Sequence, residues 1–169
     1  MRKLGFWLFL SLIGANLLAY RVSADEKPIT LEQNIVTNCA SIKVRLRQVR
    51  ANDTLTRVNY GQTYESMIKN VFTPANTRLV ANRYNASGLV ELASKFETNL
   101  SQFRIDYQNY KNQMEDLINA DCLNHPAEFY QKLTEIRGLR TSLQRHLAKL
   151  DEQIVNYQTE IARTVDARK

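Results

Sequence analysis

A heptad pattern in the last third of the chain constrains the fold more than any other feature. From residue 133 to residue 164, seam positions recur at alternating steps of three and four, and eight of the ten are apolar. They are Leu133, Ile136, Arg140, Leu143, Leu147, Leu150, Ile154, Tyr157, Ile161 and Thr164. A pattern sustained over more than four heptads predicts a long helix that packs on other helices along a narrow seam. Pro126 suits its first turn, so we expect a helix over about residues 126–167, about 60 Å long.

Two earlier stretches carry similar stripes. One runs through Ala93, Phe96, Leu100, Phe103, Tyr107, Tyr110, Met114 and Leu117. It predicts a helix over about residues 87–121, and we interpret its aromatic side chains as core packing.

The other stripe begins with Ile35, Cys39, Ile42, Leu46 and Val49, and continues less regularly through Tyr60 and Met67. It predicts a helix over about residues 30–72, with a kink, a bend or loose packing near residues 52–62. Pro74 either ends this helix or opens a short helical turn.

The three stripes together predict an all-α protein, built as an elongated antiparallel bundle or coiled coil of three long helices. Five glycines and three prolines leave little material for the turns that an all-β fold needs. We expect residues 25–169 to form one domain. Three stripes in one chain suffice for an intramolecular bundle, which favours a monomer over a dimer. Arg140 lies inside the seam, where a polar residue can set register at some cost in stability.

The N-terminus has the pattern of a targeting segment. A basic pair at residues 2–3 precedes an apolar run of 17 residues over 4–20, and the triplet Val-Ser-Ala ends at Ala24. This order predicts a signal peptide cleaved between Ala24 and Asp25. The apolar run also just reaches the length that spans a bilayer, so an uncleaved membrane anchor over residues 1–24 stays open. Both readings place residues 25–169 outside the cytoplasm: secreted, periplasmic or at the cell surface.

The two cysteines lie at corresponding ends of the first two predicted helices. Cys39 is near the start of the first helix and Cys122 is at the end of the second. In an antiparallel hairpin these positions meet at the same end. Two cysteines placed together in an exported chain predict a disulfide, with the two Cα atoms about 5–6 Å apart.

Other chemistry at the stretch NADCLNHP, residues 119–126, is less favoured. Cys122 and His125 alone are too few for a zinc site, which needs about four protein ligands; Cys39 and one carboxylate could in principle complete the set, whereas His146 is too far along its helix. A catalytic Cys–His pair would lack an orienting group. We therefore expect no metal and no cofactor, and interpret the stretch as a disulfide beside a turn.

Charge on the exported part is nearly balanced. Without the leader, 20 basic and 17 acidic residues remain, a net charge of +3, which does not favour nucleic-acid binding. The first helix is locally basic, which suggests a face for an anionic polymer, a lipid headgroup or an acidic partner, although an ordinary solvated face is the simpler reading. This face comprises Lys43, Arg45, Arg47, Arg50 and Arg57.

Three glycosylation acceptor sequences, at Asn52, Asn85 and Asn99, matter only in a eukaryotic secretory pathway.

The sequence lacks the motifs of common enzyme classes. It has no phosphate-binding glycine loop, no H-E-x-x-H helix and no G-x-S-x-G elbow. We therefore expect a non-enzymatic spacer, scaffold or interaction module at the cell envelope, with a protein or an envelope component as partner. If the leader is uncleaved, it also holds the protein on the membrane. The alternative is an extracytoplasmic holdase or small-ligand carrier with a groove lined by Phe96, Phe103, Tyr107 and Tyr110, which requires that stripe to be exposed.

Overall fold

The computed structural model describes residues 29–167, and this part of the chain is helical with no strand. The predicted leader and the cleavage site between Ala24 and Asp25 lie outside the described residues. The elements in chain order are α1 (Leu31–Met67), the π-helix η1 (Ile68–Phe72), α2 (Thr73–Ala81), α3 (Ser87–Asn119) and α4 (Pro126–Asp166). The predicted all-α class is confirmed. No helix within residues 29–167 is long and apolar enough to cross a membrane.

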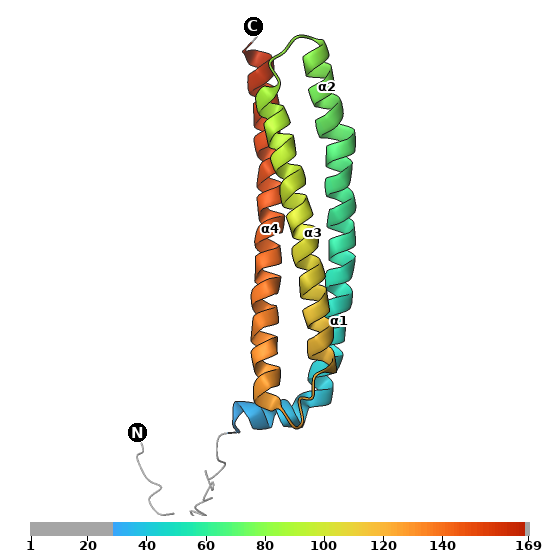
Figure 1. The fold of residues 1–169 in the computed structure, drawn as a ribbon, viewed down its shortest axis with the longest axis vertical. Helices are drawn as coiled ribbons and strands as arrows, with labels where there is room; N and C mark the ends of the chain where they lie inside the picture. The colour runs from blue at the N-terminus through green and yellow to red at the C-terminus, as the bar shows by residue number, and fades with distance from the viewer. Residues whose placement is uncertain (1–28, 168–169) are drawn as a thin grey trace, which may run out of the picture.

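Three long rods lie side by side (Figure 1). The first rod comprises α1, η1 and α2, and α3 and α4 follow it in alternating directions. The first turns of α1 lie across the foot of the other two rods before the helix bends and runs along them. The described chain begins at this foot and ends at the opposite tip, where α4 stops.

The first rod is longer than the sequence predicts. Its expected end at residue 72 is corrected to Ala81, and of the two alternatives for Pro74 the structure has the second, because Pro74 lies in the first turn of the short helix α2. Proline lacks an N–H and its ring collides with the carbonyl four residues earlier in a regular α-helix. Here the preceding turn is a π-helix, in which the Thr73 N–H donates to the Ile68 carbonyl five residues back. The wider turn accommodates the ring without ending the helix.

Local side-chain bonds define the ends near the foot. Thr30 caps α1: its hydroxyl accepts from the Gln33 N–H, and the Gln33 side chain accepts from the Thr30 N–H. This reciprocal pair satisfies two N–H groups that have no partner within the helix. Between α3 and α4, the Asp121 carboxylate accepts from the backbone N–H groups of Leu123 and Asn124. Pro126 then opens α4, as predicted.

The core lies along the seams where the three rods meet. The predicted aromatic stripe of α3 is buried: Phe96, Phe103, Tyr107 and Tyr110 expose 7% or less. On α1 the buried aromatic is Tyr64, whereas Tyr60, which we placed on the seam, is exposed and stacks on Tyr64 with ring centroids 5.7 Å apart.

The disulfide joins the first rod to the end of the second. Cys39 on α1 and Cys122, which follows α3, are bonded, and their Cα atoms lie 5.8 Å apart, within the predicted range. Both residues are buried. The bond ties α1 to the turn between α3 and α4, at the foot of the molecule.

The middle of α1 is loosely packed, as its sequence predicts. No residue between Leu46 and Tyr64 is buried, although the α-helix continues unbroken through residues 52–62. The expected irregularity is therefore one of packing and not of backbone geometry. Since α3 and α4 contact each other more extensively than α1 contacts either, α1 is the least tightly held rod along its middle.

Candidate functional site

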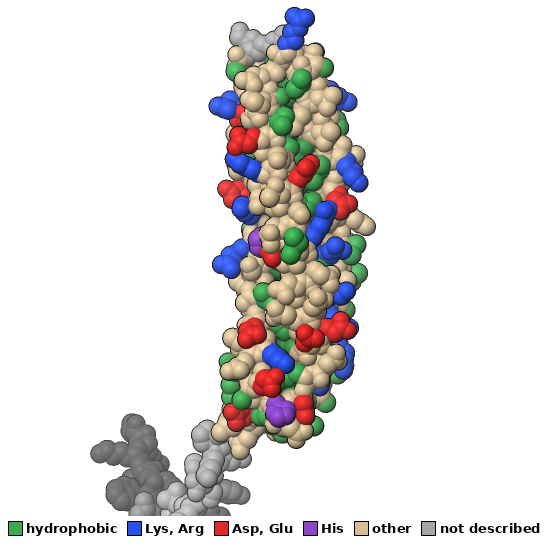
Figure 2. Space-filling view, in the orientation of Figure 1, with side chains coloured by type: hydrophobic (Ala, Val, Ile, Leu, Met, Phe, Trp, Pro, Cys, Tyr) green, Lys and Arg blue, Asp and Glu red, His purple; other side chains and the backbone are tan. Residues whose placement is uncertain are grey.

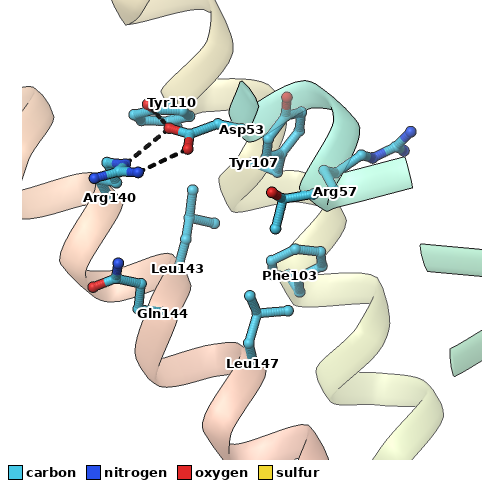
Figure 3. Close-up of a pocket in the computed structure, with 10 residues that line it drawn as sticks. Asp53, Arg57, Phe103, Tyr107, Tyr110, Arg140, Leu143, Gln144 and Leu147 are labelled. Atoms are coloured by element: carbon cyan, nitrogen blue, oxygen red, sulfur yellow. Dashed lines mark hydrogen bonds and ion pairs between the residues drawn. The ribbon is translucent and has the colours of Figure 1, made fainter. Parts of the chain in front are cut away.

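The loosely packed stretch of α1 is held to the other rods by a polar cluster. Arg140 on α4 donates from Nε and from a terminal nitrogen to the two carboxylate oxygens of Asp53 on α1, each at 2.9 Å. The Tyr110 hydroxyl on α3 donates to the same carboxylate. Figure 3 shows Asp53 lying between Arg140 and Tyr110. One carboxylate thus links all three rods.

Burial and hydrogen bonding determine the charge states in this cluster. Burial, and then the hydrogen bond to Asp53, raises the pKa of Tyr110, so its hydroxyl stays protonated and remains a donor. The hydrogen bond to Asp53 raises the pKa of Arg140 and keeps it cationic. The Asp53 side chain is 16% exposed and that of Arg140 is 47% exposed, so the ion pair is sheltered on the carboxylate side only.

A small cavity lies beside the cluster. Its volume is about 130 Å³, and Phe103, Leu143 and Leu147 form an apolar wall beside the polar residues (Figure 3). The Arg57 guanidinium lies 5.6 Å from the centre of the Tyr107 ring, at the edge of this space. Asp53 and Arg140 pair with each other at this cavity, whereas Arg57 lies over an aromatic ring. The space has room for a few water molecules, and the arrangement is suited to positioning helices.

A second hollow lies at the foot, between α1 and α4. This groove has a volume of about 480 Å³. Its apolar lining is formed by Leu31, Ile35, Ile42, Leu46, Val49, Tyr130 and Leu133. Two arginines complete the walls: Arg45 on α1 and Arg137 on α4. Within residues 29–167, neither arginine side chain has a hydrogen-bond or ion-pair partner.

The structure separates the five basic residues of α1 into different environments. Arg50 forms an ion pair with Glu115 on α3 at 3.9 Å, and Arg57 lies over Tyr107. Arg45 instead lines the groove beside α4. Lys43 is half-buried and Arg47 is exposed. A single binding face made of all five therefore stays a prediction, and their side chains point toward at least two neighbours.

The turn around Cys122 has a structural role. The Asp121 carboxylate accepts hydrogen bonds from the side-chain amide and from the backbone N–H of Asn124. Both bonds lower the pKa of Asp121, and the side-chain bond has the larger effect. His125 precedes α4 and its carbonyl accepts from the Phe129 N–H. Within the described part of the chain, no three histidine, cysteine or acidic side chains are grouped so as to hold a metal ion.

The glycosylation acceptor sequences occupy different kinds of structure. Asn85 is exposed in the loop between α2 and α3, where its side-chain oxygen accepts from the Ser87 hydroxyl at 2.8 Å. Asn52 and Asn99 lie inside α1 and α3. On the face shown in Figure 2, basic and acidic side chains are interspersed along the rod and do not form one large patch.

Comparisons of this chain with protein-family models, with curated proteins and with solved structures find no match. The residues that carry the site therefore rest on geometry alone. Sequence reasoning singled out Arg140 as a polar seam residue and residues 52–62, which include Asp53, as an irregular part of the first stripe, without connecting the two. The signal that connects them is that each interrupts its own stripe with the opposite charge. The groove at the foot was missed because it depends on how α1 bends.

Proposed function

We propose that this protein is an exported helical spacer and protein-interaction module at the cell envelope. The observation that carries the proposal is the shape: three rods, of which α4 alone has 41 residues, corresponding to about 60 Å at the α-helical rise. A rod of this length presents a long lateral surface and holds its tip far from its foot. The described chain begins at the foot, so if the leader stays uncleaved as an anchor, the tip would point away from the membrane.

The internal chemistry supports an assembly role over catalysis. At the cavity lined by all three rods, Asp53 and Arg140 bind each other and Tyr110 donates to Asp53. Asp53, Arg140 and Tyr110 therefore act in positioning α1. The disulfide at the foot supports an oxidising compartment, because such bonds persist mainly outside the reducing cytosol.

The carrier alternative required an exposed aromatic stripe. Phe96 and Phe103 are instead buried in the contact between the rods, with exposures of 0% and 2%. Their burial favours the interaction module, because a carrier of unfolded protein chains or apolar ligands needs a contiguous exposed apolar surface.

Site-specific photo-cross-linking in the native cells tests the proposal. A photoreactive residue would replace one exposed apolar side chain on each rod: Leu55 on α1, Ile105 on α3 and Val155 on α4. A reporter that is active only in the cytoplasm would be fused after Lys169 in parallel. We expect a silent reporter and a discrete adduct from at least one rod. An active reporter, or the absence of adducts from all three positions, would refute the proposal.

A further inference from the structure

The groove at the foot of the rods combines an apolar floor with two unpaired cations. Ile35 and Leu46 are buried in its floor, whereas Ile42, Val49 and Leu133 remain half-buried and Leu31 is 52% exposed. These apolar side chains remain in contact with water along a concave surface. Covering them with another apolar group would lower the free energy. The volume of about 480 Å³ lies within the range of small-molecule sites.

The charges around this groove have a single sign. Arg45 and Arg137 line it from opposite helices, and its other polar lining residues, Asn34 and Tyr130, are neutral. No acidic residue lines it. Some of the other cations on the described rods are in ion pairs, as in Arg50–Glu115 and Lys132–Glu128. Two uncompensated guanidinium groups beside an apolar surface favour a ligand that carries both an anionic group and a hydrocarbon chain.

The position of the groove indicates the source of such a ligand. The described chain begins at Ile29, two residues before Leu31, so a leader that stays uncleaved would hold the groove close to the membrane. The groove therefore faces the membrane if the proposed placement of the foot is correct. Tyrosine is enriched at the level of lipid headgroups, and Tyr130, 37% exposed, stands at this end of α4.

We propose that this groove binds one anionic phospholipid, with an acyl chain along the apolar floor and the phosphate at Arg45 and Arg137. This inference rests on the proposed envelope location, and it adds a ligand class to the foot of the rod. Guanidinium groups suit the phosphate because their planar donors match its oxygens. The ligand would fill the gap between the bent start of α1 and α4, and so would fix the orientation of the rod at the membrane.

Native mass spectrometry of the oxidised protein with short-chain phosphatidylglycerol, kept below its micelle concentration, tests the proposal. We expect a one-to-one complex, and no comparable complex with short-chain phosphatidylcholine. The double variant Arg45→Gln/Arg137→Gln should weaken binding by at least about tenfold. The matched control Arg47→Gln/Arg145→Gln removes the same charge from the same two helices outside the groove, and should change binding by less than about twofold.

A second pair of variants tests the apolar floor. Leu31→Asn should weaken binding, whereas Leu55→Asn, on the same helix and 65% exposed, should not. Both positions are exposed, so both variants should fold. Equal losses from the two arginine pairs would show general charge attraction and overturn the proposal. The absence of a lipid complex would overturn it too, as would binding of a designed acidic amphipathic peptide in place of lipid.

The two proposals fail separately. A silent C-terminal reporter and protein cross-links without lipid binding would leave the interaction module standing and remove the lipid site. An active cytoplasmic reporter would remove the envelope function, whatever the purified protein binds.

Discussion

Arg140 on α4 and Asp53 on α1 lie 87 residues apart in the sequence and form a two-point ion pair, with both N–O distances at 2.9 Å. The pair bridges the stretch in which α1 buries no side chain between Leu46 and Tyr64. A carboxylate and a guanidinium therefore hold α1 where apolar packing does not. This relationship makes the middle of α1 dependent on charge, and it leads to the first prediction.

Breaking the pair from one side should cost more than replacing both partners. Arg140→Gln should lower the free energy of unfolding by about 1–2 kcal/mol, because it leaves the sheltered Asp53 carboxylate without its cation. Asp53→Leu/Arg140→Leu should be closer to wild type than the sum of the single changes, since apolar residues can replace such a pair in a seam. Denaturant unfolding measures both, with Arg145→Gln as a solvent-exposed control. Additive losses in the double variant would contradict this role.

Stability should fall at alkaline pH through two buried tyrosines. Burial raises the pKa of Tyr64 and of Tyr110, and hydrogen bonds to Asp151 and Asp53 raise them further. A raised folded-state pKa gives stability that is complete below the unfolded value, about 10, and is lost as pH rises above it. The variant Tyr64→Phe/Tyr110→Phe should therefore lose less stability than wild type between about pH 9 and pH 11. If the free energy of unfolding changes equally with pH in wild type and in the variant, the two tyrosines are not the cause of the loss.

Removing the disulfide should destabilise the protein without removing its helices. The bond closes a loop with a sequence separation of 83 residues, for which chain entropy predicts a loss of up to about 4.5 kcal/mol. Cys39→Ser and Cys122→Ser should each lower the melting temperature while circular dichroism stays helical, because the apolar seams remain. Mass spectrometry of a non-reducing digest should show one peptide pair that links the two positions. Free thiols in the native protein would contradict the pairing.

The aromatic contact near the π-helix η1 should contribute strongly to the stability of the half of the bundle that ends at the tip. Phe72 exposes 1%, stacks on Tyr157 with ring centroids 4.0 Å apart, and meets Phe96 edge-on. Phe72→Ala should cost about 3–5 kcal/mol because it opens a cavity among these rings. The neighbouring Val71, 39% exposed, is the matched control, and Val71→Ala should cost far less. Similar losses from the two variants in chemical unfolding would show that the rings are not tightly packed.

The leader can be tested independently of the fold. If residues 1–24 are a cleaved signal peptide, intact mass and N-terminal peptide analysis of the protein from its native cells should begin at Asp25. An intact Met1 together with a membrane-bound fraction would indicate the anchor. Recovery of an uncleaved protein in the cytosolic fraction would contradict both readings.

Much of the fold follows from local periodicity. The stripe from Leu133 to Ile161 turns inward on α4, with Ile136, Leu143, Leu150 and Tyr157 buried, because an apolar face on a helix has a lower free energy away from water wherever it packs. The start of α4 at Pro126 was also predictable from local preference, since proline is favoured in the first turn of a helix. The disulfide followed from the antiparallel order, which places Cys39 opposite Cys122.

Only the tertiary structure decided the features that depend on contacts between residues distant in the sequence. Pro74 taken alone signals either a helix end or the start of a short helical turn, and the structure has the short helix α2 continuing the rod through a π turn, beside the packed rings of Phe72 and Tyr157. Asp53 reads as a defect in one stripe until Arg140 from another rod is placed beside it. The groove at the foot exists only because α1 bends there against α4. Local propensity determines which residues form helices, whereas contacts between helices determine which breaks in the pattern become interactions.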